Sequence, residues 1–301
     1  MYYQPYNTID VLMLGSSHIH CDVNTGVLWS DFGIAAYDYS AAEQPLWTSY
    51  YYLKECCKYQ KPKLVVLDLY SPARFKEEYQ YEWLNENLCG IRFSINKLQM
   101  LLASCEFSAI DEYFPSFFVY HNRYTELTAE DFTFPIRAGK ELKSFKGFTP
   151  FWGRNEQAEP ALTEKSIGGL TAKSEEYLEK IIEYTENQGI ELFLIVSPYI
   201  TTDEDETVYN RIREIADYYE IDFNSTNYHY DEIGIDFDQD FNDPSHLNYW
   251  GACKFSRYLG NEIRKRFNDV VPDRRGNEHY DSWEINTQSL TEEAMEHEVT
   301  Q

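Results

Sequence analysis

The sequence predicts an α/β protein with three layers, in which a central, mostly parallel sheet lies between two layers of helices. Two observations predict this fold. Short runs that are apolar throughout alternate with amphipathic helical segments, a pattern typical of parallel strands covered on both faces. The chain has 301 residues, which suits one large domain or two small ones, and it is 43% hydrophobic, which is enough for a core.

The first part of the chain predicts a strand, a helix and a second strand. Residues Ile9–Leu14 form an apolar run that stops at Gly15, as expected of a buried strand. Residues Trp47–Tyr59 have helical spacing, and Lys63–Leu69 form the next apolar run. A strand–helix–strand unit of this kind indicates parallel pairing.

Residues 71–170 interrupt this alternation. They contain one fair helical pattern, Phe93–Ala103, among Pro, Phe and Gly breaks. We therefore expect an inserted, mainly helical cap, and long insertions of this kind often carry function.

The alternation resumes after the insertion. Its elements share either a helical spacing of apolar residues or a continuous apolar run. They are a helix at Thr171–Gln188, a strand at Ile190–Val196, a helix at Glu206–Tyr219, a short strand at Glu220–Phe223 and a helix at Leu247–Phe267. We expect residues 1–266 to form one domain and residues 267–301 to be an acidic, flexible tail.

The net charge of −25 argues against nucleic-acid binding and against electrostatic attachment to anionic lipid. Much of it is concentrated: residues 203–243 hold 14 acidic and 2 basic side chains, and residues 267–301 hold 9 and 2. The first segment ends beside a candidate catalytic motif. We expect an acidic rim there that disfavours polyanionic substrates.

The sequence offers no convincing metal or cofactor site. The six cysteines lack the spacing of a zinc site and are interpreted as thiols. The acidic run from Asp236 to Asp243 lacks the Gly and the Glu that a calcium loop needs at its sixth and twelfth positions. Glycine-rich phosphate loops are also missing from the sequence. We expect no metal and no cofactor.

Two short motifs together indicate nucleophilic catalysis. Ser17 follows the first strand in Gly15-Ser16-Ser17-His18, at the edge where parallel sheets bind ligands. The second motif, Asp243-Pro244-Ser245-His246, precedes the last helix, and its spacing places a carboxylate near an imidazole. Each motif alone is more often an ordinary turn or helix cap.

Together they resemble the SGNH (GDSL-type) hydrolase superfamily, whose fold is a flavodoxin-like α/β/α sandwich. The resemblance covers about residues 7–75 and 171–266. It implies that Ser17 is the nucleophile, His246 the general base and Asp243 its orienting acid. The stretches LGSSH, AEQPLWTSYYYLKE, KPKLVVLDLY and DPSHLNYWGA are similar to a branch that includes the D-alanine transfer protein of teichoic acid synthesis and the alginate O-acetyltransferases.

The sequence departs from the superfamily at the oxyanion hole. The second block usually supplies a Gly and the third an Asn, and neither is present here. Backbone amides of Ser17, Ala41 and Ala42 are the candidates for this role. Candidates for substrate binding are His18, Tyr70 and a polar cluster in the insertion. The cluster consists of His121, Asn122 and Arg123.

The resemblance implies an acyl ester hydrolase or O-acyltransferase that acts on a cell-envelope carbohydrate, in some relatives beside a membrane-bound O-acyltransferase. The alternative is a non-catalytic glycan-binding or assembly protein that keeps the fold. The sequence as given has no signal peptide, which favours the cytoplasm if Met1 is the true start. The resemblance favours an extracytoplasmic protein held by an upstream anchor, and we expect the latter.

Overall fold

The computed structural model describes residues 1–113, 145–163 and 165–299. Five parallel strands form one sheet in the order β2-β1-β3-β4-β5, which is the flavodoxin-like order. The strands are β1 (Val11–Leu14), β2 (Ala36–Asp38), β3 (Leu64–Asp68), β4 (Glu191–Val196) and β5 (Asp222–Ser225). The predicted three-layer fold is confirmed.

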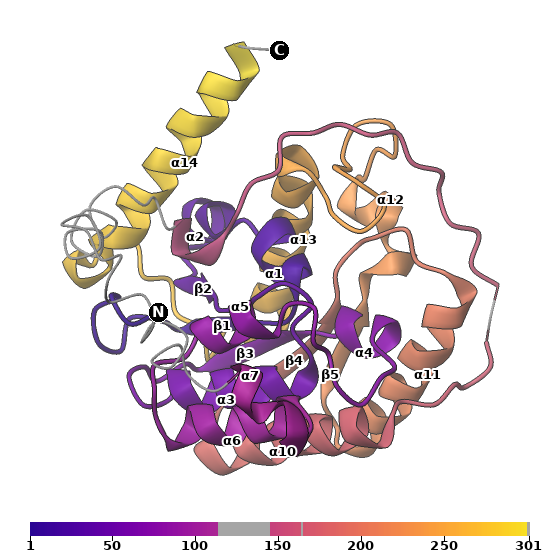
Figure 1. The fold of residues 1–301 in the computed structure, drawn as a ribbon. Helices are drawn as coiled ribbons and strands as arrows, with labels where there is room; N and C mark the ends of the chain where they lie inside the picture. Colours follow the sequence, from indigo (N-terminus) through magenta and orange to yellow (C-terminus); the bar gives the residue numbers. More distant parts are fainter. Residues whose placement is uncertain (114–144, 164, 300–301) are drawn as a thin grey trace, which may run out of the picture.

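Helices cover both faces of the sheet (Figure 1). One face carries α3 (Leu46–Cys56), α10 (Ala172–Gln188) and α11 (Asp203–Tyr218). The other carries α1 (Ser17–Asp22), α2 (Thr25–Phe32) and α13 (Tyr249–Phe267).

Alternation along each strand explains the two cores. In β1, Leu12 and Leu14 pack under α3, while Val11 and Met13 pack under α13. Both sets are fully buried, because successive side chains of a strand point to opposite faces. This is why β1 is apolar throughout instead of alternating with polar residues.

The inserted region lies mainly against one helical layer. Its helices are α4 (Tyr70–Arg74), α5 (Leu84–Cys89), α6 (Ile95–Ser104) and α7 (Ile110–Tyr113). Helix α6 packs on α3, and the Tyr52 hydroxyl donates to the carbonyl of Asn87 at 2.7 Å. Residues 148–163 and 165–170 contain no helix or strand. The described helices of the insertion therefore extend the α3 layer.

The expectation of a flexible tail at residues 267–301 is wrong for its described part. Residues Asp281–Val299 form α14, preceded by a short turn of helix. Tyr280, Trp283, Leu290 and Ala294 are buried, and α14 packs on α2. Together with the buried Asn286, these residues recur three or four positions apart, a stripe that the surrounding polar residues conceal.

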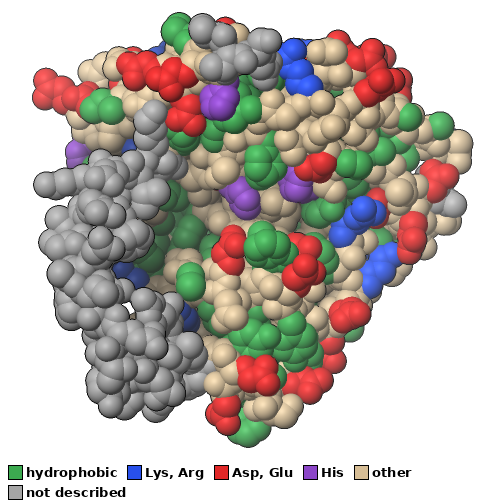
Figure 2. All heavy atoms as spheres, turned by 45° about the horizontal axis from the view of Figure 1, so that its top comes forward, with side chains coloured by type: hydrophobic (Ala, Val, Ile, Leu, Met, Phe, Trp, Pro, Cys, Tyr) green, Lys and Arg blue, Asp and Glu red, His purple; other side chains and the backbone are tan. Residues whose placement is uncertain are grey.

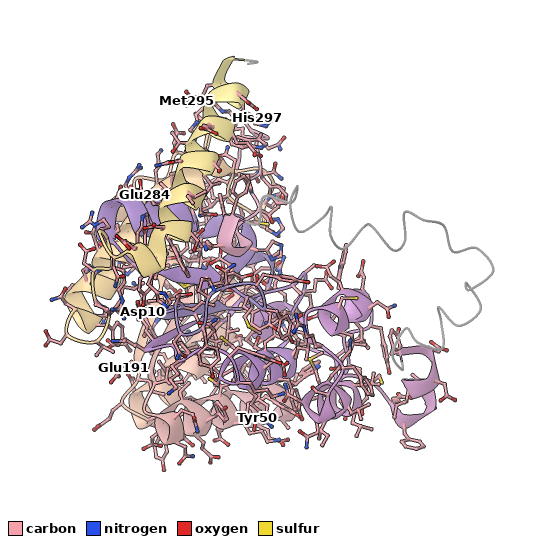
Figure 3. The ribbon with its side chains drawn as sticks, turned by 90° about the vertical axis from the view of Figure 1, so that its left-hand side faces the viewer. Asp10, Tyr50, Glu191, Glu284, Met295 and His297 are labelled. Atoms are coloured by element: carbon pink, nitrogen blue, oxygen red, sulfur yellow. The ribbon has the colours of Figure 1, made fainter. Side chains whose placement is uncertain are left out.

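Helix α14 stays in contact with the body of the protein at its far end, where the His297 ring stacks on Trp152 with a centroid distance of 4.0 Å. Figure 3 shows Met295 and His297 near that end, with Glu284 closer to the sheet. Arg274, just before the helix, donates to both carboxylate oxygens of Asp10 at 2.6 and 2.8 Å. The last part of the chain is thereby joined to the start of β1. No helix of the described residues is long and apolar enough to cross a membrane.

Candidate active site

Ser17 is positioned by a tight turn at the carboxyl end of β1. Gly15 has φ +150°, and a Cβ there would lie 2.8 Å from the Cβ of Asp68 and 2.9 Å from Cγ1 of Ile19. Only glycine fits such a close approach without displacing its neighbours. The chain then enters α1, whose first residue is the half-buried Ser17.

His246 is presented by a compact loop before α13. The Asp243 carboxylate accepts from the backbone amides of Ser245 at 2.8 Å and His246 at 3.0 Å. This is the local side-chain-to-backbone bonding that favours Asp in turns. The next amide, that of Leu247, donates to Oδ1 of Asp22 at 2.9 Å. Because Asp22 ends the helix that Ser17 begins, this bond links the loop directly to α1.

Ser17, His246 and Asp243 form one continuous chain of contacts. Nε2 of His246 lies 2.8 Å from Oγ of Ser17. Nδ1 of His246 lies 3.0 Å from each carboxylate oxygen of Asp243. The imidazole side chain is 20% exposed and the carboxylate 39%. The structure thus brings together all three residues expected from the two motifs, although 229 positions separate Ser17 from His246.

The surroundings favour an ionised Asp243. Partial burial acts against the charge, but hydrogen bonds and the charge of His246 outweigh it. The pKa of Asp243 is therefore held well below its usual range. Nδ2 of Asn242 contributes by donating to Oδ2 at 3.0 Å. A carboxylate that stays charged beside Nδ1 fixes the tautomer of His246 and stabilises an imidazolium.

His18 does not face substrate, contrary to expectation. Its ring is fully buried and stacks on Tyr70 with a centroid distance of 3.7 Å. Burial, followed by the charge of His246, lowers the pKa of His18 far below its ordinary value, so the ring is neutral. Nδ1 lies 3.7 Å from Oδ2 of Asp22, a carboxyl whose pKa burial raises strongly. The buried His18 ring therefore stabilises the site by packing against Tyr70.

Tyr70 lies beside the catalytic loop. Its ring covers His18, and its hydroxyl is 3.3 Å from Oγ of Ser245. The side chain is half-buried. Tyr70 therefore remains a candidate for contact with substrate.

The backbone amides predicted for the oxyanion hole differ in their surroundings. The amide of Ala42 donates to Oε1 of the exposed Glu86 at 3.3 Å, so it can serve an oxyanion only when this bond is released. Ala41 is buried beside Ser40, whose hydroxyl lies 3.0 Å from Nδ1 of His20. Ser17 and Ala41 remain the amide candidates. The polar cluster at His121, Asn122 and Arg123 lies outside the described residues.

The sequence did not single out the wall beside His246. The Phe151 ring meets the imidazole edge-on at 5.6 Å, and the carbonyl of Phe151 accepts from the amide of Tyr249 at 2.7 Å. Asn155 similarly donates from its amide to the carbonyl of Phe241 at 2.9 Å. In the sequence, this segment is recognisable only as part of an insertion with irregular breaks, because its aromatic residues have no periodic spacing.

The described residues contain no group of three or more His, Cys, Asp or Glu side chains arranged to hold a metal ion. In the acidic loop, Asp240 is buried and accepts from Nζ of Lys254 at 2.6 Å. Figure 2 shows histidine side chains at the surface near the middle of the face that it draws, with acidic side chains around them.

Comparison with known proteins adds little. One model of an uncharacterised family matches residues 156–268, which include His246 and Asp243 but not Ser17. A search of curated proteins finds no match.

Proposed function

We propose that this protein is a serine-dependent acyl ester hydrolase or O-acyltransferase of the SGNH type that acts on a carbohydrate. The observation that carries the proposal is the Ser17–His246–Asp243 chain, with 2.8 Å between Oγ and Nε2 and 3.0 Å between Nδ1 and the carboxylate. A nucleophile, a base and an orienting acid in mutual contact are the parts that acyl transfer requires.

In the proposed reaction, Oγ of Ser17 attacks the ester carbonyl while Nε2 of His246 accepts the serine proton. The charge on Asp243 stabilises the resulting imidazolium. His246 then returns the proton to the departing alcohol, which leaves an acyl group on Ser17. Water or a sugar hydroxyl next attacks the acyl-enzyme and gives its proton to His246. His246 passes this proton to Oγ of Ser17 as the acyl–serine bond breaks, and the acid or a new ester is released.

The resemblance extends the proposal beyond the site. By analogy with the similar branch, the carbohydrate belongs to the cell envelope, the protein works outside the cytoplasm, and a membrane-bound O-acyltransferase is its partner. Fold-level analogy supports these points, whereas the chemistry of the site supports the reaction.

Labelling with a fluorophosphonate probe tests the proposal, because such probes react with activated serines. We expect one modified residue, Ser17, and loss of both labelling and acetyl-ester hydrolysis in Ser17→Ala. The matched control is Ser16→Ala: the Ser16 hydroxyl is buried and has no hydrogen-bond partner among the residues that the structure describes, so this variant should retain labelling at Ser17. Unchanged hydrolysis in Ser17→Ala would refute the mechanism. A folded protein without labelling or hydrolysis would instead favour the non-catalytic glycan-binding alternative.

A further inference from the structure

A pocket lies at the same edge of the sheet as Ser17. It has a volume of about 340 Å³ and is formed by residues 159–162 and the segment after β5. That segment comprises a short turn of helix (Thr226–Tyr228) and α12 (Tyr230–Ile233). Since β5 is three places from β1 in the sheet, the ends of the two strands are about 14 Å apart. Figure 1 shows α12 and α1 over this end of the sheet.

One wall of the pocket is apolar and rigid. Pro160, Leu162 and Tyr228 line it, and the Tyr228 ring is 51% exposed. The Tyr228 hydroxyl donates to Oε2 of Glu206 at 2.7 Å, which fixes the orientation of the ring. An exposed, pre-oriented tyrosine offers a flat apolar face to a ligand.

The remaining lining is polar and carries several negative charges. Glu159, Asp231 and Glu232 provide carboxylate acceptors, and His229 lies with Nδ1 3.2 Å from Oε2 of Glu232. The pocket-lining residues include neither Lys nor Arg. The described acidic and histidine side chains do not group closely enough to hold a metal ion, so these carboxylates act as separate hydrogen-bond acceptors.

Asn227 adds a donor to the pocket. It is 2% exposed, and its Oδ1 accepts from the amide of Tyr199 at 3.2 Å. Oδ1 also lies 3.1 Å from the hydroxyl of Tyr230, whose shorter bond, at 2.5 Å, is to the carbonyl of Tyr199. Because a backbone amide can only donate, the bond from Tyr199 fixes which atom is oxygen. Nδ2 has no hydrogen-bond partner within the described part of the chain, and a buried donor of this kind favours a ligand with an acceptor.

A ligand for this pocket needs an apolar face, several hydroxyl or ammonium donors, an acceptor for Nδ2, and no negative charge. We propose that the pocket binds one saccharide unit, either neutral or carrying an amino group. The pocket then forms a distal subsite for a carbohydrate chain whose ester group reacts at Ser17. This connection to Ser17 rests on the proposed function. The carbonyl of Pro244, in the catalytic loop, accepts from the amide of Ile200 at 2.9 Å. The amide of Tyr199 donates to Asn227 of the pocket, so the segment after β4 contacts both the pocket and the catalytic loop.

Isothermal titration calorimetry of the full chain with D-glucose, D-glucosamine and D-glucuronate tests the subsite. We expect the first two sugars to bind at least about tenfold more tightly than D-glucuronate, because its carboxylate meets the acidic lining. Tyr228→Ala should weaken D-glucose binding by about tenfold or more. Tyr6→Ala, at a tyrosine of similar exposure (60%) outside the pocket, should not.

Two further variants separate this proposal from the proposed function. The double variant Glu159→Gln, Glu232→Gln keeps the acceptors but removes two charges, and it should raise the affinity for D-glucuronate towards that for D-glucose. Ser17→Ala should leave sugar binding unchanged. Equal binding of the three sugars, no binding of D-glucose, or loss of binding in Ser17→Ala would overturn the subsite. Fluorophosphonate labelling of Ser17 is read independently, so its failure would overturn only the catalytic proposal.

Discussion

At the scale of single residues, Asp243 is the shared hydrogen-bond acceptor of the site. Its two oxygens accept from the backbone of Ser245 and His246, from the Asn242 side chain and from the imidazole. The same carboxylate therefore shapes the loop and orients the base. This double use explains why Asp and His are three positions apart.

Asp243→Asn should separate these two tasks. The amide oxygen can still accept backbone bonds, but the charge that stabilises the imidazolium is gone. We expect kcat for ester hydrolysis to fall by about 10⁴-fold with little change in thermal stability, since such replacements in other triads cost that much. Asp238→Asn, at an exposed residue of the neighbouring loop, is the control and should keep full activity. A fall of less than tenfold would contradict the assigned role.

At the scale of elements, the turn from β1 into α1 decides where Ser17 lies. Gly15→Ala should lower both stability and activity, because the new Cβ meets Asp68 and Ile19 below 3.0 Å and φ is +150°. We expect Tm to fall and fluorophosphonate labelling of Ser17 to slow. Gly169→Ala is the matched control, since no heavy atom lies within 4 Å of its added Cβ. Equal behaviour of the two variants would show that the turn tolerates a side chain.

Trp283 is one of the largest fully buried side chains of the described residues and belongs to α14. This side chain is fully buried, and its Nε1 donates to the carbonyl of Ala36 at 3.0 Å. We expect Trp283→Ala to reduce the free energy of unfolding by about 3–5 kcal/mol, as large-to-small core substitutions do. Urea denaturation measures this. Ile285→Ala on the same helix, where the side chain is 62% exposed, should change stability by less than about 0.5 kcal/mol. Comparable losses in both would mean that α14 does not pack as described.

At the scale of the whole molecule, Lys146 joins segments that are far apart in the sequence. Its Nζ donates to Oε1 of Gln4 at 2.6 Å and to Oγ of Ser282 at 2.7 Å, and it lies 3.8 Å from the centre of the Trp283 ring. Burial lowers the pKa of Lys146 to about 7. A cation at this position is costly to keep in the folded state.

Stability should therefore depend on pH through Lys146. Between about pH 7 and 10 the unfolded chain holds a proton that the folded chain has released, so the free energy of unfolding rises with pH. The slope from this group is at most about 1.4 kcal/mol per pH unit. Urea denaturation at pH 7 and pH 9 should show the rise, and Lys146→Met should reduce it, because burial also lowers the pKa of Lys173, to about 8, and that group contributes part of the rise. Lys265→Met, at a lysine whose side chain is 71% exposed, should retain it. A rise of the same size in Lys146→Met would assign the effect to other groups.

The sequence by itself determined the layered fold and the catalytic triad candidates. Continuous apolar runs such as Leu64–Asp68 indicate strands buried on both faces, and their alternation with amphipathic helices leaves few other architectures. Strand β2 was missed because three residues are too short to show a period. Ser17 and Asp243-Pro244-Ser245-His246 were recognisable because their chemistry depends on residue type and local spacing.

Only the tertiary structure decided how these residues meet. It places Nε2 of His246 against Oγ of Ser17, buries His18 and engages the Ala42 amide with Glu86. It also turns the supposed tail into α14 and brings Phe151 against the base. The physical reason is that burial and hydrogen-bond partners are set by segments distant in the chain, such as Asp22 and Leu247. Local sequence patterns therefore do not predict those partners.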